Sequence, residues 1–131
     1  AEHDPMTTPR QTVIPQLRMT DAERSLRFYT EGLGFREDWR HQYEPGMPLF
    51  VQLTRAGQTI YLSGHAGDGN PGGAVFFVVP DVDAVYRALP DWLAMHVSPP
   101  AAMPWGTREL AMLDPDSNRL RFATYAPDAD A

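Results

Sequence analysis

The sequence contains no cysteine and no lysine, so all eleven cationic side chains are arginine. Without cysteine the chain can form no disulfides, thiolate metal sites or cysteine nucleophiles. No apolar run approaches the ~18 residues of a membrane-spanning helix, and we expect no membrane partner. The net charge is −6, without a basic stripe. Phosphate neutralisation supplies most nucleic-acid affinity, so we expect no nucleic-acid partner either.

The length predicts a single domain. At 131 residues the chain can bury roughly two thirds of its unfolded surface. We expect residues 1–10 to be a tail, with Met6 as the natural start, residues 11–125 to be the domain, and residues 126–131 to be a C-terminal tail. The first residues are polar and lack the apolar centre of a secretory signal. A cytoplasmic location is therefore the prediction.

The first half of the chain predicts one strand, one helix and three strands. Thr20 and Glu23 have the spacing of a capping box at the start of the helix, and Gly32 is a natural stop. The expected strands are Thr12–Met19, Phe35–Tyr43, Pro48–Leu53 and Thr59–Ser63. Residues 64–73 follow as a linker with five glycines, and we interpret them as a connection because phosphate-loop motifs are missing.

The second half predicts the same order of elements. Ala74–Val79 is an apolar strand, and Asp81 caps a helix that ends at Pro90. A loose segment runs to Met103. A hairpin then follows, with strands Arg108–Leu113 and Arg119–Thr124 around the turn Asp114–Asn118.

The two halves are related by a constant offset of sixty residues. The offset places Asp81 on Asp21, Arg108–Leu113 on Pro48–Leu53, and the turn Asp114–Asn118 on a five-residue turn at Thr54–Gln58. Such an offset indicates an internal duplication of a βαβββ unit. We therefore predict an α+β fold of two tandem modules, residues 11–64 and 73–125. Their free sheet faces are the expected ligand site.

Short segments spread from Val13 to Thr124 carry a resemblance to a known family. They are Ile14-Pro15-Gln16-Leu17, Asp21, Phe28-Tyr29, Leu33-Gly34-Phe35, Phe50, Arg55, Thr59-Ile60-Tyr61-Leu62-Ser63, Pro104-Trp105-Gly106, Arg108-Glu109, Asp114-Pro115-Asp116 and Asn118. With the duplicated βαβββ pattern, they make the chain resemble the vicinal oxygen chelate superfamily of glyoxalases, ring-cleaving dioxygenases and bleomycin-resistance proteins. Within it, the chain is most similar to the bleomycin-binding resistance proteins.

Enzymes of that superfamily hold a divalent metal with histidine and glutamate on cleft-facing strands. The matching positions here are Ile14, Gly72–Ala74 and Arg121, which offer neither imidazole nor carboxylate. The three histidines within the expected domain have no ligand spacing. We therefore predict no metal, no cofactor and no catalytic residue.

The resemblance implies that aromatic side chains hold a planar ligand. The matching positions are Phe50, Phe76 and Trp105, with Ser63 on a neighbouring strand. Trp39 can add to that surface. Phe76 is equally consistent with the core, because it lies in an apolar strand. Alternation places Arg121 on the cleft face, where it can pair with an anionic ligand group or with Glu109.

Pro15 matches a proline near the strand that crosses between subunits in these relatives. It predicts a dimer arm and a strand-exchanged homodimer, although it is also suited to starting an edge strand. The predicted function is metal-independent sequestration of a small aromatic molecule, with a bleomycin-type antibiotic as the leading candidate. The mixed charge pattern at residues 36–44 differs from the acid-rich clefts of bleomycin binders and leaves open another aromatic natural product. The alternative is a metal-dependent lyase, isomerase or dioxygenase of the same superfamily.

Overall fold

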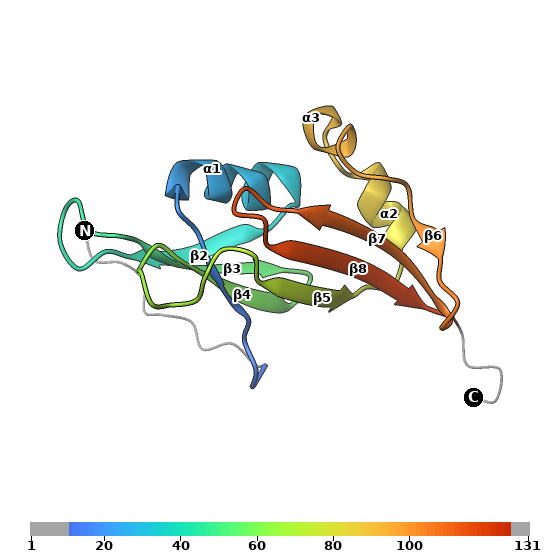
Figure 1. Cartoon of the computed structure of the whole chain (residues 1–131), viewed down its shortest axis with the longest axis horizontal. Helices are drawn as coiled ribbons and strands as arrows, with labels where there is room; N and C mark the ends of the chain where they lie inside the picture. The colour runs from blue at the N-terminus through green and yellow to red at the C-terminus, as the bar shows by residue number, and fades with distance from the viewer. Residues whose placement is uncertain (1–10, 127–131) are drawn as a thin grey trace.

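The computed structural model describes residues 11–126, which form two four-stranded mixed sheets with short helices on one side (Figure 1). The strand orders are β1-β4-β3-β2 and β5-β8-β7-β6. In each sheet the first strand of a half pairs in parallel with the last one, and the remaining pairs are antiparallel. The predicted α+β fold of two βαβββ units is confirmed.

The first half begins with a strand much shorter than the predicted Thr12–Met19. Its elements are β1 (Gln16–Arg18), α1 (Ala22–Arg27), the π-helical turn η1 (Phe28–Gly32), β2 (Arg36–His41), β3 (Phe50–Arg55) and β4 (Gln58–Ser63). The helix ends at Gly32, as its sequence predicts. The pairing of β2 with β3 shifts register between Glu37 and Trp39, which leaves Asp38 in a bulge.

The second half contains two elements that the sequence did not predict. Its elements are β5 (Ala74–Val78), α2 (Val82–Arg87), α3 (Asp91–Ala94), β6 (Ala101–Ala102), β7 (Thr107–Leu113) and β8 (Arg119–Tyr125). The segment expected to be loose therefore holds a helix and a short edge strand. Pro90 does not end α2; it is the N-cap residue of α3, where a missing N–H costs nothing.

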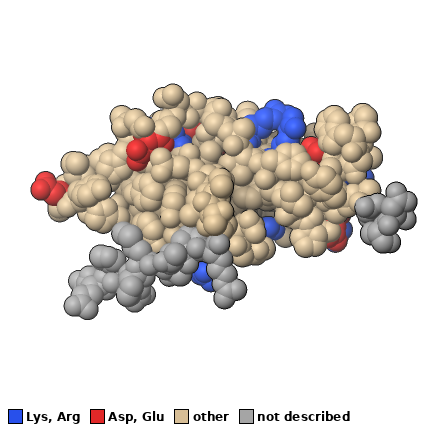
Figure 2. All heavy atoms as spheres, turned by 90° about the horizontal axis from the view of Figure 1, so that it is seen from below, with Lys and Arg blue, Asp and Glu red and all other residues tan. Residues whose placement is uncertain are grey.

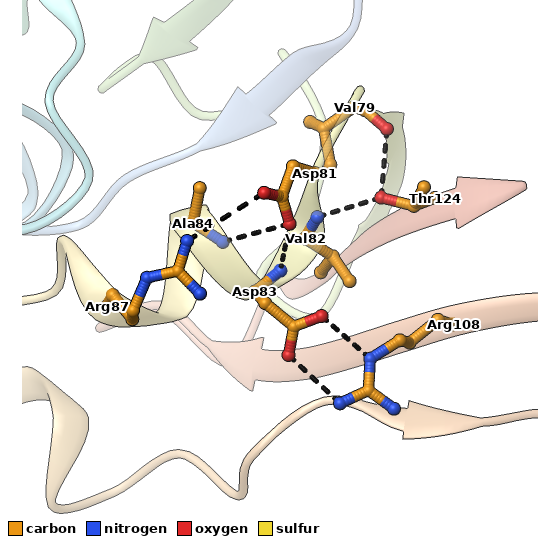
Figure 3. A network of polar contacts seen from close by, with 8 residues as sticks. All are labelled: Val79, Asp81, Val82, Asp83, Ala84, Arg87, Arg108 and Thr124. Atoms are coloured by element: carbon orange, nitrogen blue, oxygen red, sulfur yellow. Dashed lines mark hydrogen bonds and ion pairs between the residues drawn. The ribbon is translucent and has the colours of Figure 1, made fainter.

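Each main helix begins at an aspartate. The Asp21 carboxylate accepts a hydrogen bond from Arg24 N at 3.1 Å, so the predicted cap at Thr20 was wrong. Asp81 is the cap of α2, as predicted, and accepts from the backbone N–H groups of Asp83 and Ala84 (Figure 3). These bonds satisfy N–H groups that have no partner within the helix.

The predicted turn Asp114–Asn118 connects the two halves, and its residues Asp114, Asp116 and Asn118 are buried. Asp114 accepts hydrogen bonds from Tyr29 Oη at 2.6 Å, Asn118 Nδ2 at 2.8 Å, and the backbone N–H groups of Asp116 and Asn118. Asp116 accepts from Thr20 and Ser25 at the start of α1. Burial, followed by the charge of Asp114, raises the Tyr29 pKa far above its ordinary value.

The sixty-residue offset holds for the paired outer strands but not for the hairpins. Met19 N donates to Ser63 O, and sixty residues later Val79 N donates to Ala123 O. However, β3 and β4 are joined by only Ala56 and Gly57, so the expected five-residue turn at Thr54–Gln58 was wrong. The connection in the second hairpin has five residues, 114–118, and the strand register there is shifted by one position relative to the offset. Ser63 therefore faces Phe50 in its sheet, whereas Ala123 faces Glu109.

One hydrophobic core runs through both halves on the helix side of the sheets. Leu26 and Tyr29 of the first half are buried, as their helical spacing predicts. Phe35 contacts Phe77 edge-on, with 5.9 Å between the ring centroids, and Phe77 stacks on Phe122 at 4.8 Å. Among residues 11–126 no helix is long and apolar enough to cross a membrane.

Candidate functional site

Three aromatic rings from neighbouring strands form a continuous surface on the first sheet, on the face away from α1. Trp39 of β2 stacks on Phe50 of β3, with 6.0 Å between ring centroids and an interplanar angle of 22°. Tyr61 of β4 contacts both rings, at 4.9 Å from Phe50 and 6.1 Å from Trp39. The register explains this contact, because Trp39 pairs with Gln52 and Gln52 pairs with Tyr61.

A cavity of about 540 Å³ opens beside this aromatic surface. The residues that line it all lie between positions 39 and 68, and they are Trp39, His41, Tyr43, Phe50, His65, Ala66 and Asp68. Its size is within the range of small-molecule sites. Tyr43 extends its aromatic wall and packs edge-on between two imidazoles, 4.4 Å from the His41 ring and 5.8 Å from His65.

Ser63 is buried and organises the loop that closes one side of the cavity. Its hydroxyl donates to the Asp68 carboxylate at 2.8 Å and accepts from the backbone N–H of His65 at 3.1 Å. These bonds hold Asp68 and His65 in the cavity wall. Ser63 therefore shapes the cavity through the loop that follows β4.

Polar side chains support the aromatic surface from the bulge in β2. Asp38 accepts hydrogen bonds from Gln52 Nε2 at 3.0 Å and from the hydroxyl of Thr54, and it pairs with Arg36. Burial acts to raise the pKa of Asp38, but these hydrogen bonds and the Arg36 charge outweigh it and lower the pKa. The carboxylate therefore stays ionised and fixes the orientation of the Gln52 amide.

Three buried polar atoms around this surface have no hydrogen-bond partner within the described part of the chain: Trp39 Nε1, Gln52 Oε1 and His65 Nε2. The Gln52 side chain is only 2% exposed, and its Nε2 is already committed to Asp38. Buried polar groups in native proteins are nearly always paired. Ordered water, or a bound molecule with hydrogen-bond donors and acceptors, would supply the hydrogen bonds that these atoms lack.

The free face of the second sheet carries a different arrangement, built around Glu109. Its carboxylate accepts from Trp105 Nε1 at 2.9 Å and from the hydroxyl of Thr107 at 2.5 Å. The hydrogen bond from Thr107, followed by that from Trp105 and the charge of Arg121, lowers the pKa of Glu109. The sequence allows Arg121 to pair with an anionic ligand group or with Glu109. In the structure the charge of Arg121 affects the pKa of Glu109, but the two side chains do not form a close ion pair.

Large apolar side chains remain exposed on this second sheet. Phe76 is 43% exposed, and Trp105 is 64% exposed although its indole N–H is bonded. Val78, Leu113 and Tyr125 are also exposed. The view from the side away from α1 shows a surface on which charged residues are sparse (Figure 2). Apolar surface of this kind is typical of an interaction site.

The structure brings together only some of the predicted site residues. Trp39 and Phe50 meet at the cavity, with Ser63 behind its loop. Phe76 and Arg121 lie in strands of the other sheet, and Trp105 lies in the loop before β7. None of the three lines this cavity, so one chain does not join its two faces into a single cleft. Phe76 instead contributes to a groove with the segment that contains Pro15.

Sequence reasoning missed Tyr61, His41, His65 and Asp68 as parts of this cavity. A signal for Tyr61 existed, because alternation in β4 places it on the same face as Ser63. The histidines were tested as metal ligands and set aside because they lack ligand spacing. Asp68 could not be placed, because its position depends on the path of the glycine-rich segment.

The residues present do not fit a metal at the positions expected from the resemblance. Ile14 precedes β1 and has no donor atom, and Arg121 brings a cation. The backbone N–H of Gly73 is bonded to Asn118 Oδ1 at 2.7 Å. Within residues 11–126, no three histidine, aspartate or glutamate side chains gather closely enough to hold a metal ion.

A family described as glyoxalase superfamily proteins matches residues 6–128. The chain belongs to the glyoxalase superfamily. No curated protein sequence matches it significantly. The superfamily contains both antibiotic-binding proteins and metal-dependent enzymes, so the residues of the site must decide between binding and catalysis.

Solved structures of similar fold include antibiotic-binding proteins. A member of the glyoxalase/bleomycin resistance protein/dioxygenase superfamily from Sphaerobacter thermophilus is 26% identical, with a TM-score of 0.63 over 87% of this chain and 98% of its own. An antibiotic-binding protein from Streptomyces sp. CB03234 is 21% identical, with a TM-score of 0.66 over 95% and 100%. The bleomycin-binding protein of Streptomyces verticillus, solved with copper(II)-bleomycin, is 22% identical, with a TM-score of 0.63 over 93% and 100%.

Proposed function

We propose that this glyoxalase superfamily member binds and sequesters a planar aromatic molecule without transforming it. The observation that carries the proposal is the surface of Trp39, Phe50 and Tyr61 beside an open cavity. Each ring stacked on a flat ligand contributes about 0.5–1.5 kcal/mol beyond the burial of its area. Three rings can therefore give useful affinity without a metal or a nucleophile. Bleomycin-type antibiotics are the leading candidates.

We also propose that a two-fold homodimer completes the site. Arg121 lies on the second sheet and Trp105 in the loop before β7, and the exposed apolar face of this sheet needs a cover. In a two-fold dimer this face of one subunit can meet the aromatic surface of its partner, so that each cleft takes Phe50 from one chain and Trp105 from the other. Pro15, whose carbonyl accepts from Tyr61 N at 2.8 Å beside β1, is the proposed start of the arm.

The first test is titration of the purified protein with bleomycin, followed by tryptophan fluorescence. We expect saturable quenching, at least tenfold weaker binding in Phe50→Ala, and no change in Trp92→Phe. Trp92 is the matched control because it lies under Arg27 on the helix side, 5.0 Å from the guanidinium carbon to the ring centroid. Unchanged fluorescence across bleomycin and other aromatic antibiotics would contradict the proposal. So would stoichiometric nickel, zinc, iron or manganese in the purified protein.

A complementation experiment tests the shared cleft. Phe50→Ala and Trp105→Ala each damage both clefts of a homodimer. If each cleft combines the two chains, a mixed dimer of these variants has one cleft with both changes and one intact cleft. Unfolding and refolding the variants together should then restore about half a site per dimer at wild-type affinity. If each chain forms its own cleft, mixing restores nothing.

A further inference from the structure

A second cavity lies where the two halves meet, next to α2 and separate from the aromatic surface. Its volume is about 530 Å³. The residues that line it come from both halves and are Phe35, Arg55, Ala56, Gln58, Phe77, Val78, Val79, Pro80, Asp81, Ala84 and Val85. It shares no lining residue with the cavity beside Trp39. Most of its wall is apolar, and buried phenylalanines form part of it.

Arg55 is the one cation in this wall, and its charge is not balanced by an acid. Its Nε donates to the backbone oxygen of Leu33 at 2.9 Å, and its guanidinium carbon lies 5.7 Å from the centroid of the Phe122 ring. No ion pair and no other hydrogen bond joins the side chain of Arg55 to any residue between 11 and 126. The other N–H groups of its planar fork therefore remain available.

The acid in the same wall is already engaged. One oxygen of Asp81 accepts from the backbone N–H groups of Asp83 and Ala84, and the other lies 3.8 Å from Arg87 (Figure 3). Asp81 thus serves α2 and leaves Arg55 without a counter-charge. A half-buried charge has lost part of its hydration, and burial accordingly lowers the pKa of Arg55.

We infer that this cavity binds a small carboxylate with an apolar body. The guanidinium fork of Arg55 matches the two oxygens of a carboxylate, and such charge-assisted pairs are stronger than neutral ones. The apolar body would lie along Phe35, Phe77 and Val85. The protein's net charge of −6 disfavours anions elsewhere on its surface, so binding at Arg55 should be specific.

Calorimetric titration with decanoate tests this inference, with 1-decanol as the uncharged counterpart. We expect one decanoate per chain and much weaker binding of decanol. Arg55→Gln should weaken decanoate binding by roughly tenfold to a hundredfold, as expected for loss of a charged hydrogen-bond partner. The decanoate affinity of Arg55→Lys should lie between those of the wild type and Arg55→Gln, because lysine keeps the charge but not the planar fork.

Three further variants make the result decisive. Arg108→Gln removes the same charge from an exposed site and should bind decanoate like the wild type. Ala84→Leu keeps Arg55 but fills the cavity from an exposed helix position, so it should abolish binding even if Arg55→Gln folds poorly. Phe50→Ala should leave decanoate binding unchanged, which separates this site from the proposed aromatic one. The inference would be overturned if Arg55→Gln and Ala84→Leu both bound decanoate as tightly as the wild type. It would also be overturned if the wild type showed no saturable binding below the micelle concentration of decanoate.

Discussion

The two halves share one pattern of elements but use their hairpins for different purposes. In the first half, β3 and β4 are joined by the two residues Ala56 and Gly57, both at positive φ, and the end of β3 contributes to the cavity at Arg55. In the second half the corresponding turn is longer and buried, and Asp114–Asn118 bonds to both halves. The duplicated unit therefore supplies the scaffold. The difference in loop length decides that the second hairpin bonds the two halves together, whereas the first does not.

The free sheet faces differ in the same way. The first carries an aromatic surface with a cavity and buried polar atoms that lack partners. The second carries exposed apolar side chains around Trp105. We interpret the first as the floor of a ligand site and the second as the surface that covers it in a dimer.

The largest difference in the free energy of unfolding between matched changes in the two hairpins should come from Asn118. Its side chain is fully buried, donates to Arg18 O and Asp114, and accepts from Gly73 N. Asn118→Ala leaves those groups unpaired and should lower the free energy of unfolding by about 2–4 kcal/mol. Its counterpart Gln58 is exposed, so Gln58→Ala should change it by less than about 0.5 kcal/mol. Urea unfolding measures both, and equal effects would show that the hairpins are equivalent.

A smaller effect is expected where α1 meets the second hairpin. Tyr29 donates to Asp114 at 2.6 Å, whereas Leu89, sixty residues later, is buried without a polar group. Tyr29→Phe keeps the ring in the core and removes only the hydroxyl. It should cost about 1.5–3 kcal/mol, since the acceptor is a buried carboxylate. The same urea measurement would contradict this account if Tyr29→Phe unfolded at the wild-type midpoint.

These residues show what the sequence could and could not predict. Helical spacing placed Tyr29 on the buried face, and the offset of sixty predicted both modules. Nothing local indicated that Tyr29 would meet Asp114, because a contact across 85 residues depends on how the halves pack. The turn residues of Asp114–Asn118 correctly predicted a turn, but whether a turn is exposed or buried is decided by its neighbours in space.

The candidate site was predictable to a similar extent. Trp39 and Phe50 were identified and do meet, because strand alternation determines which side chains share a face. Asp68 and His65 reach the cavity through a glycine-rich segment with no periodic pattern. Arg55 was noted for its place in the resemblance, but its lack of a counter-charge is visible only when every acid near it is placed.

The carboxylates on the two free faces give a pH test of the comparison. The folded-state pKa values of Asp38 and Glu109 are both lowered, from ordinary values of 3.8 and 4.5. Their stabilising effect is therefore complete above those ordinary values and is lost as pH falls through the lower folded values. Asp38→Asn and Glu109→Gln should each reduce the acid-side fall in the free energy of unfolding below about pH 4.5. Urea unfolding of the wild type and both variants at pH values between 3 and 7 measures this fall in the free energy of unfolding.

The two variants should differ in one spectroscopic property. Glu109 accepts from the indole N–H of Trp105, so Glu109→Gln should shift the emission of that exposed tryptophan. Asp38→Asn leaves Trp105 unchanged, because Asp38 bonds to Gln52 and Thr54 on the other sheet. Identical emission spectra for the two variants would contradict the hydrogen bond between Trp105 and Glu109.

The smallest effect should come from a surface ion pair that only the second half has. Asp83 on α2 accepts two hydrogen bonds from Arg108 on β7, at 2.8 and 2.9 Å (Figure 3). The residue sixty positions earlier, Glu23, makes no ion pair within the described residues. The Arg108 hydrogen bonds lower the pKa of Asp83, so the pair stabilises the fold above about pH 3.8 and loses this effect as pH falls further.

Salt distinguishes this pair from the buried connections. The side chains of both partners of the Asp83–Arg108 pair are partly exposed to solvent, where ions screen their attraction. Arg108→Gln should therefore lower the urea midpoint only slightly at low ionic strength and not at all in 1 M sodium chloride. Asn118→Ala should keep its full effect in both buffers, since its partners are buried and its bonds do not depend on mobile ions. A salt-independent loss in Arg108→Gln would mean that α2 is held to β7 by the packing of the arginine stem rather than by its charge.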